Sequence, residues 1–442
     1  MNILGISCFY HDAACALIKD GMLIAAAEEE RFSRIKHDSD FPKNAINFCL
    51  KKGKIMPQDI DACVFYEKPF LKFERLLLSI LYGYPCSLKL FQEAMKTWLS
   101  KKLWIKNILQ EKLGLPESKI YFSEHHLSHA ASAFFCSPYE EAAILTVDGV
   151  GEWTSASLGI GKSYWNGSHG KNSLDLENEI RFPHSLGMLY SAFTAFLGFE
   201  VNEGEYKMMG MSPYGEPKYM EKIYKLIHIN EDGSFVLDMT YFSYTYHSEK
   251  TFTDKFTKLF GKPRNPKARF VTDKTSLFDD PNPPTEEELK INQYYADIAA
   301  SIQKVTEEII LKMAKYLHKK TGLKKLCMAG GVALNSVANY RILKETPFEE
   351  IYIQPAAGDS GGAIGAALYF YHVILGKPRA FVMKHAFWGE EHGENSIHEF
   401  LNKEGIKYET IEDDEKLFER IIDRLMKGNV IGWYQGAFEW GT

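Results

Sequence analysis

Short apolar blocks separated by polar corners predict strands at the start of the chain. Residues 2–8 are apolar, a polar corner follows at 10–12, and residues 13–18 are apolar again. Lys19-Asp20-Gly21 is a good hairpin turn, because glycine adopts positive φ without steric cost. Residues 22–28 are therefore expected to form a third strand, so that the chain opens with an antiparallel meander.

The same order of blocks returns more than a hundred residues later. An apolar run over 142–147 ends at Asp148-Gly149, which turns the chain, and residues 153–160 continue as a strand. The two blocks differ in spacing, so they are not units of a solenoid repeat. They predict two copies of one α/β core.

Amphipathic segments between these blocks predict helices. Residues 70–113 carry apolar side chains at helical spacing with lysines between them, which favours a helical layer beside the core. A basic element lying on a membrane surface is the alternative. Residues 289–320 contain neither glycine nor proline and are expected to form one long helix.

Two strands in the second half run directly into glycine-rich turns. Residues 325–329 precede Gly330-Gly331 and a helical segment, and residues 351–354 precede a loop with Gly358 and a second helix. Such turns present backbone N–H groups and helix N-termini to a phosphate, although glycine clusters also serve close packing alone. The nucleotide-binding candidates are Gly149, Gly330, Gly331, Asn335 and Gly358.

The last part of the chain has a different character. Residues 228–290 are rich in Asp, Pro, Thr and Lys and predict irregular or inserted structure, and a linker is expected near 376–384. Residues 385–442 then begin a new unit. Its predicted elements are helices near 395–404 and 414–427, a strand between them and a strand at 430–434. We expect this unit to be cut off before its core can close.

Composition narrows the class of protein. The 442 residues suggest two or three domains, and 45% hydrophobic with 25% charged residues is typical of a soluble globular protein. A net charge of −6 argues against nucleic-acid binding through bulk charge. We find neither a signal peptide nor a membrane-spanning stretch, and seven cysteines without CxxC spacing suggest buried reduced thiols. A cytoplasmic protein is expected.

The strongest chemical signal is a histidine pair followed by two acidic turns. His125 and His129 are spaced i, i+4 and share one helix face, whereas His126 points about 100° away. Asp148 ends a predicted buried strand, and Asp359 lies in a glycine-rich loop. Two imidazoles and two carboxylates form a mixed site suited to a Lewis-acidic metal. The alternative is that the histidines serve as caps or core hydrogen-bonders and the aspartates form turns.

Two further residues are candidates for catalysis. His11 lies in the polar corner between the first two strands, and Lys36 follows the third. They could orient an anion or a carbonyl beside the metal, or the corner could simply cap a strand end.

Taken together, these residues resemble the O-carbamoyltransferases, a family that includes the nodulation-factor, cephamycin and tobramycin-type enzymes. The resemblance extends from residue 1 to 442. It rests on an ordered set of separate motifs: 7–14 (SerCysPheTyrHisAspAlaAla), 28–38, 125–130 (HisHisLeuSerHisAla), 147–152, 204–210, 330–335 (GlyGlyValAlaLeuAsn) and 358–366.

The resemblance implies a fold and a set of site residues. It implies a duplicated ribonuclease-H-like, actin-like domain over 1–375, followed over 385–442 by the incomplete N-terminal part of an α/β domain that forms acyl-adenylates. The implied metal ligands are His125, His129, Asp148 and Asp359, with iron expected before zinc or manganese. His11 and Lys36 match positions close to the carbamoyl and nucleotide groups, and Asp238 matches a position that contacts the acceptor.

The resemblance also implies a reaction. The family makes carbamoyl-adenylate from carbamoyl phosphate and ATP, with Mg²⁺ accompanying the ATP, and transfers the carbamoyl group to a hydroxyl of a small-molecule or sugar-like acceptor. We expect this chain to retain only the transfer half, without nucleic-acid or membrane partners, and a homo-oligomer is among the expectations. The alternatives are a phosphotransferase or ATPase of the same superfold, and a non-catalytic nucleotide-binding remnant.

Overall fold

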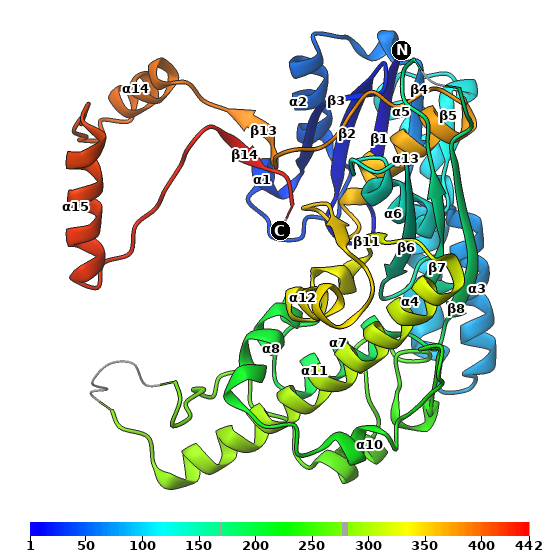
Figure 1. Ribbon diagram of the computed structural model, residues 1–442, viewed down its shortest axis with the longest axis vertical. Coiled ribbons are helices and arrows are strands. Elements are labelled where there is room, and N and C mark those ends of the chain that lie inside the picture. The colour runs from blue at the N-terminus through cyan, green and yellow to red at the C-terminus, as the bar shows by residue number, and fades with distance from the viewer. Residues whose placement is uncertain (168, 276–281, 442) are drawn as a thin grey trace.

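The computed structural model describes residues 1–167, 169–275 and 282–441, and its body is built on two five-stranded mixed sheets (Figure 1). The first has the order β3-β2-β1-β4-β5 and the second β12-β11-β6-β7-β8. The strands of the first are β1 (Asn2–Ser7), β2 (Ala14–Lys19), β3 (Met22–Glu28), β4 (Ala62–Phe65) and β5 (Ile120–Phe122). Those of the second are β6 (Glu141–Val147), β7 (Thr154–Lys162), β8 (Ser173–Arg181), β11 (Lys325–Ala329) and β12 (Glu350–Ile353).

The two sheets share one topology. In the first, β1 pairs antiparallel with β2 and parallel with β4. In the second, β6 pairs antiparallel with β7 and parallel with β11. Each sheet is thus a three-stranded meander extended by two parallel strands on the other side of its first strand. This repeat confirms the predicted duplicated ribonuclease-H-like, actin-like fold.

Two helices pack against each other between the sheets. Helix α6 (His125–Phe134) contacts α13 (Gly361–Tyr369), which also contacts β1 and β2. The contact is so close that a Cβ at Gly365 would lie 1.8 Å from the carbonyl oxygen of Ser128. Because only glycine lacks a Cβ, Gly365 permits this approach, which sets the position of α6 relative to the Asp359 loop.

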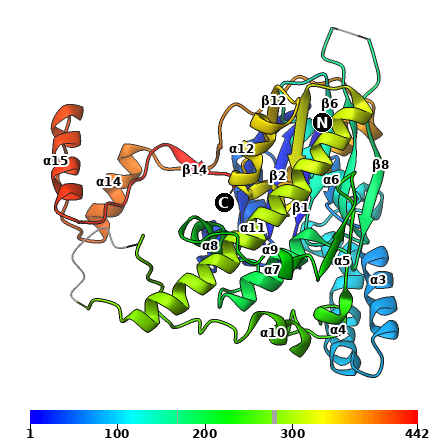
Figure 2. The ribbon, with the colours of Figure 1, turned by 60° about the horizontal axis from the view of Figure 1, so that its bottom comes forward.

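The predicted helical layers are present. Residues 70–113 form α3 (Pro69–Tyr82), α4 (Leu88–Ser100) and α5 (Ile105–Leu113), and the first sheet also carries α2 (Lys43–Gly53). The predicted long helix is α11 (Glu286–Thr321), which contacts β6 and β7 of the second sheet and crosses the molecule in Figure 2. It starts three residues early because Thr285 and Glu288 form a capping box, and it stops at Gly322 with φ 69°. Beside α11 lie α7 (Leu186–Phe196), α8 (Glu205–Met211), α9 (Met220–Ile223) and α12 (Ser336–Glu345).

Most of residues 228–290 is irregular, as predicted. The segment holds the end of β9 (Ile227–Ile229), β10 (Phe235–Leu237), α10 (Asp254–Phe260) and the start of α11. Residues 276–281 of it lie outside the described residues. The expected linker near 376–384 has no regular structure, but it is anchored: the buried Arg379 side chain donates to the carbonyl oxygens of Tyr139 and Phe135.

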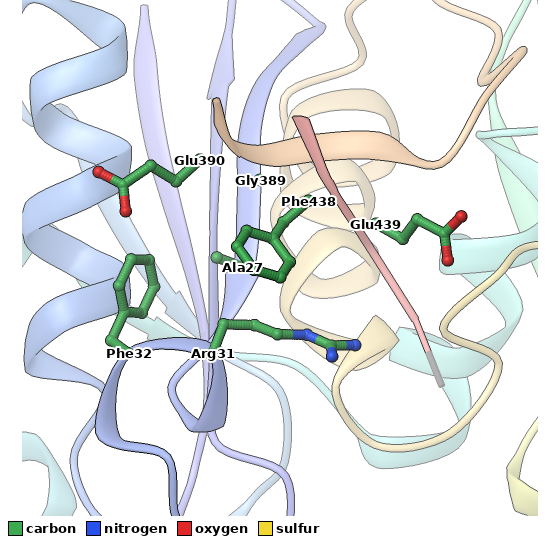
Figure 3. A pocket seen from close by; sticks show the side chains of 7 residues that line it. All are labelled: Ala27, Arg31, Phe32, Gly389, Glu390, Phe438 and Glu439. Atoms are coloured by element: carbon green, nitrogen blue, oxygen red, sulfur yellow. The ribbon is translucent and has the colours of Figure 1, made fainter. Parts of the chain in front are cut away.

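The C-terminal segment leaves the body and returns to it. Strands β13 (Phe387–Glu391) and β14 (Ala437–Glu439) pair antiparallel, while α14 (Glu394–Lys403) and α15 (Asp414–Met426) extend away between them (Figure 1). The paired strands β13 and β14 lie against β3. A small pocket remains there, lined by residues that include Arg31, Phe32 and Phe438 (Figure 3).

Two predicted strands of this segment are wrong. Residues 404–413 and 430–434 form no strand, and the pairing falls instead at 387–391 and 437–439. The apolar pattern at 430–434 has no sheet to join, and Val430 is 97% exposed. The assignment of 385–442 to an adenylate-forming domain, like the boundary at 375, stays a prediction.

Two other expectations concern membranes and thiols. Across the described residues, no helix combines the length and the apolar character that a membrane crossing requires. All seven cysteines are free thiols; six are buried as expected, whereas Cys86 is exposed in the turn between α3 and α4.

Candidate metal centre

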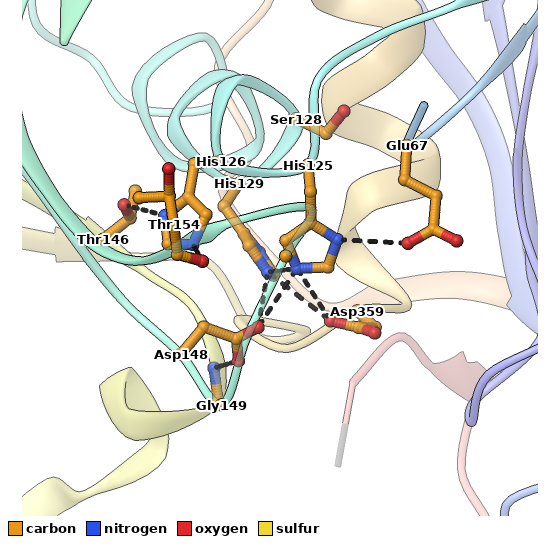
Figure 4. A network of polar contacts seen from close by, with 12 residues as sticks. Glu67, His125, His126, Ser128, His129, Thr146, Asp148, Gly149, Thr154 and Asp359 are labelled. Atoms are coloured by element: carbon orange, nitrogen blue, oxygen red, sulfur yellow. Dashed lines mark hydrogen bonds and ion pairs between the residues drawn. The ribbon is translucent and has the colours of Figure 1, made fainter. Parts of the chain in front are cut away.

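The histidine pair lies at the beginning of α6. The carboxylate of Glu152 accepts a hydrogen bond from the backbone N–H of His125 at 3.1 Å, which satisfies one of the free donors of the first helical turn. One turn of helix then places His129 beside His125, and their Nε2 atoms are 3.0 Å apart (Figure 4). The predicted shared face is therefore present, and both rings are buried.

Two carboxylates complete the cluster from different elements. Asp148 follows β6, and its Oδ2 lies 3.0 Å from His125 Nε2 and 3.7 Å from His129 Nε2. Asp359 precedes α13, and its Oδ1 lies 3.5 Å from both nitrogens. Asp148 and Asp359 are themselves buried. All four residues singled out in the sequence thus converge on one point.

The spacing of these donor atoms fits one metal ion. Ligand bonds of about 2.1 Å separate neighbouring donors by about 3.0 Å in octahedral and about 3.4 Å in tetrahedral geometry. The five separations given above run from 3.0 to 3.7 Å. Two carboxylates also balance the charge of a divalent ion. Because imidazole and carboxylate suit iron, zinc and manganese, the donor set does not choose among them.

The electrostatics of the cluster favour positive charge at its centre. Burial alone lowers the pKa of His125, but Asp359, Asp148 and Glu67 outweigh it and hold the pKa well above its ordinary value. Burial raises the pKa of Asp148, but hydrogen bonds from His125 and His129 hold it well below its usual range. The same field that stabilises imidazolium would stabilise a cation held between these groups.

His126 serves a different purpose, as its position on the helix predicted. Its Nε2 donates to the carbonyl oxygen of Thr154 at 2.8 Å, and its Nδ1 accepts from the Thr146 hydroxyl at 2.7 Å. Burial, followed by the neighbouring His125 and His129, lowers the pKa of His126 to about 3. This ring is therefore neutral and ties α6 to the second sheet.

Of the two predicted catalytic residues, His11 reaches the cluster. Its Nε2 lies 3.8 Å from Asp359 Oδ2, while its Nδ1 is 2.6 Å from Asp12 Oδ2. The second oxygen of Asp12 is 2.7 Å from Nδ1 of His37. Lys36, the neighbour of His37, is half exposed, and its Nζ pairs with Glu30 at 3.2 Å rather than with a cluster residue.

Two of the nucleotide-binding candidates, Gly330 and Gly331, lie beside the cluster on the side of the second sheet. The N–H of Gly331 donates to Asp148 Oδ1 at 2.9 Å, and the N–H of Gly330 donates to the carbonyl oxygen of Ala357 at 2.8 Å. The two glycine-rich turns are thereby joined next to Asp148 and Asp359. Their role in nucleotide binding stays a prediction.

Four other candidates make hydrogen bonds or ion pairs within the protein. Asn335 caps α12 by accepting from the N–H of Ala338 at 3.1 Å, and the carbonyl oxygens of Gly149 and Gly358 accept hydrogen bonds from the Ser185 hydroxyl and the Gly361 N–H. Asp238, the predicted acceptor contact, caps a short turn at 239–241 and pairs with Lys255 at 3.1 Å. Its contact with an acceptor stays a prediction.

The sequence pattern did not single out the residues behind the cluster. The Tyr66 hydroxyl lies 3.5 Å from Asp359 Oδ2, and Glu67 Oε2 lies 3.7 Å from Nδ1 of His125. Both residues follow β4 directly. A carboxylate immediately after a buried strand is the signal that identified Asp148, and it could have identified Glu67 as well.

Known proteins place this chain in a family. Residues 2–368 match the family described as "Carbamoyltransferase N-terminus". An uncharacterised protein of Synechocystis sp. is 46% identical over 453 residues, covering 100% of this chain and 69% of that protein. Nodulation protein NolNO of Sinorhizobium fredii is 31% identical over 445 residues, covering 98% of this chain and 57% of that protein. A solved structure, component A of (R)-2-hydroxyglutaryl-CoA dehydratase from Acidaminococcus fermentans, aligns with a TM-score of 0.41 and 14% identity over 84% of this chain and 97% of that one. The match of residues 2–368 to the family model decides the family. The chain belongs to the carbamoyltransferases, and the match lies in the N-terminal region of that family.

Proposed function

We propose that this chain transfers a carbamoyl group from carbamoyl-adenylate to a hydroxyl of a small-molecule or sugar-like acceptor at the cluster of His125, His129, Asp148 and Asp359. The observation that carries the proposal is the convergence of four buried donors at metal-like spacing, with His11 beside them. A divalent ion held by these four residues would supply a Lewis acid that polarises the carbamoyl carbonyl or holds the adenylate phosphate.

His11 is the residue that we propose for proton transfer. Its Nδ1–H donates to Asp12, so the Nε2 atom is the one that faces the cluster. Burial alone would lower the pKa of His11, but the hydrogen bond to Asp12 and the charge of Asp359 raise it to about 9. An imidazolium at this position can donate its Nε2 proton to the carbamoyl oxygen as negative charge develops there.

The transfer itself exchanges one carbon–oxygen bond for another. The acceptor oxygen bonds to the carbamoyl carbon, the bond from that carbon to the phosphate oxygen breaks, and the hydroxyl proton passes to the departing phosphate of AMP. The joined turns at Gly330-Gly331 and Gly358 are the proposed support for the adenylate, because they lie beside two of the ligands, Asp148 and Asp359. Holding both reactants at this rim contributes the orientation part of catalysis.

The donor-forming reaction is a separate proposal. The chain spans 69% and 57% of the two relatives described above. We propose that carbamoyl-adenylate is formed from carbamoyl phosphate and Mg²⁺–ATP in a separate step that precedes the transfer.

The test compares two donors on metal-loaded protein with a panel of hydroxylated acceptors. Transfer is measured from pre-formed carbamoyl-adenylate and, in parallel, from carbamoyl phosphate with ATP. We expect product from the adenylate, and loss of both metal and transfer in His125→Ala and Asp359→Ala. The matched control is Glu124→Gln, next to His125 on the half-exposed outer side of the helix start. Full metal content and full transfer in both alanine variants would overturn the proposal.

A further inference from the structure

A buried carboxylate lies behind the ring of His125. Glu67 follows β4, its side chain is 6% exposed, and its Oε2 is 3.7 Å from His125 Nδ1, on the side of the ring opposite the cluster (Figure 4). We infer that Glu67 is a positioning residue that holds the imidazole of His125 in the orientation and tautomer required for metal binding. This inference rests on the metal centre proposed above.

The ring of His125 needs an acceptor at that position. Its Nε2 faces His129, Asp148 and Asp359, so a neutral ring that binds metal through Nε2 carries its proton on Nδ1. That Nδ1 is buried and has no hydrogen-bond partner among the described residues. A ligating histidine ordinarily directs its second N–H to a carboxylate or a carbonyl, which fixes the tautomer and raises the basicity of the ligating nitrogen. Glu67 Oε2 is the carboxylate oxygen that faces this nitrogen.

Lys72 holds Glu67 in this position. The Lys72 ammonium contacts the same oxygen, Oε2, at 2.5 Å, and it is itself buried with its charge over the ring of Tyr10. An ammonium in direct contact with Oε2 favours the anionic form of Glu67. Lys72 keeps the buried charge compensated and fixes the direction of the oxygen that faces the ring.

The end of β4 is also fixed relative to α6. The Ser128 hydroxyl donates to the carbonyl oxygen of Tyr66 at 2.8 Å, and the N–H of Ser123 donates to the carbonyl oxygen of Phe65 at 2.9 Å. Ser128 lies on α6 between the two ligating histidines. Tyr66 and Glu67 therefore approach the cluster from a strand end that cannot shift independently of the helix.

The charges agree with this assignment. Asp148, Asp359 and Glu67 contribute three negative charges, and Lys72 contributes one positive charge. A divalent ion brings this buried group to neutrality, which is the condition under which charges are tolerated away from water. Glu67 thus belongs to the charge balance of the centre as well as to its geometry.

The experiment measures metal binding rather than activity. Co²⁺ affinity is obtained by competition with a chelator, and the Co²⁺ absorption spectrum reports the coordination directly, for the wild-type chain, Glu67→Gln and Glu124→Gln. Glu124 is the matched control because it also pairs with a lysine, Lys68 at 2.6 Å, and caps the start of α6, but its side chain is 49% exposed, against 6% for Glu67. We expect Glu67→Gln to lower the affinity on the order of 10- to 100-fold and to alter the spectrum, and Glu124→Gln to change neither.

A double variant separates positioning from fold stability. Glu67→Gln leaves Lys72 buried without its partner, so Glu67→Gln with Lys72→Met is measured alongside. We expect the double variant to keep the weakened affinity. Recovery of wild-type affinity in the double variant would overturn the inference, because the loss would then reflect the unpaired ammonium. If Glu67→Gln kept the wild-type affinity and spectrum, the inference about Glu67 would be overturned and the proposed function would stand. If the wild-type chain bound no metal, both the inference and the proposed function would be overturned.

Discussion

Substitution of Gly365 by alanine tests whether the contact between α6 and α13 sets the geometry of the centre. The added Cβ would lie 1.8 Å from the carbonyl oxygen of Ser128 and 2.9 Å from the backbone nitrogen of Ser132, where an ordinary contact is at least 3.4 Å. Both neighbours are helix backbone, so no side chain can rotate away. The difference between 3.4 and 1.8 Å requires the helices to separate by about 1.6 Å.

The expected cost follows from this displacement. Overpacking a close contact lowers the free energy of unfolding by about 1–3 kcal/mol. Because this clash is with backbone atoms, we expect a loss of about 3 kcal/mol. An unfolding entropy of about 2.1 cal/mol/K per residue converts this to a decrease in Tm of about 3 °C for a chain of 442 residues that unfolds as one unit. Ligand positions must hold to about 0.5 Å, so Co²⁺ affinity should fall by at least about tenfold.

Thermal unfolding and Co²⁺ titration check both parts of this prediction. Gly210→Ala is the control, because a Cβ at that helical position meets nothing within 4 Å. It should raise stability by about 0.5–1 kcal/mol through helix propensity and leave Co²⁺ affinity unchanged. A Gly365→Ala chain with wild-type Tm and wild-type affinity would refute the reasoning that the helix contact positions the ligands.

Three further predictions concern other parts of the structure. Trp440→Phe removes one of two hydrogen bonds to the buried Gln354 Oε1, which keeps the one from the N–H of Ala356. The change should cost about 0.5–1.5 kcal/mol in urea unfolding; an unchanged midpoint would contradict it. Burial raises the pKa of the Glu28 carboxyl to about 7. The stability that this protonated carboxyl contributes is complete below its ordinary pKa of 4.5 and is lost as pH rises through 7. Glu28→Gln should therefore be more stable than wild type at pH 8, and a lower unfolding midpoint at that pH would contradict this. Arg379→Met leaves the carbonyl oxygens of Tyr139 and Phe135 without their buried donor and should lower the unfolding free energy by about 3 kcal/mol, whereas a value within 0.5 kcal/mol of wild type would count against it.

Local patterns predicted the parts of this protein that local physics decides. The meanders, the long helix α11 and the HxxxH face follow from periodicity, turn residues and capping, each contained within a few residues. Asp148 and Asp359 were predicted because a carboxylate at the end of a buried strand or in a glycine-rich loop has few structural reasons to be there. The same local signal marks Glu67 as a candidate, but its contact with His125 depends on β4 and β5 being neighbours in the sheet, which no local pattern reveals.

The strand predicted at 430–434 is wrong because a local pattern is not sufficient to form a strand. Its short apolar run satisfies the local rule for a strand, but a strand forms only when another strand offers free hydrogen-bonding groups. In the described residues, β13 pairs with 437–439 instead. The predictions for Lys36 and Asp238 depend on bound ligands, so neither local pattern nor fold decides them.

The duplicated topology explains why the cluster exists at all. The first strand of each copy, β1 or β6, is followed by a polar residue of the site, His11 or Asp148. The next strand beside it, β4 or β11, is followed by Glu67 or Gly331. The outer strand, β5 or β12, leads into the element that carries His125 or Asp359. Equivalent strand ends from both copies therefore meet at one place, at the carboxyl ends of parallel strands where α/β sheets bind ligands. Each copy alone supplies half of the donors, and the contact between α6 and α13 brings the halves together. An ion at this point would be held by both copies of the fold.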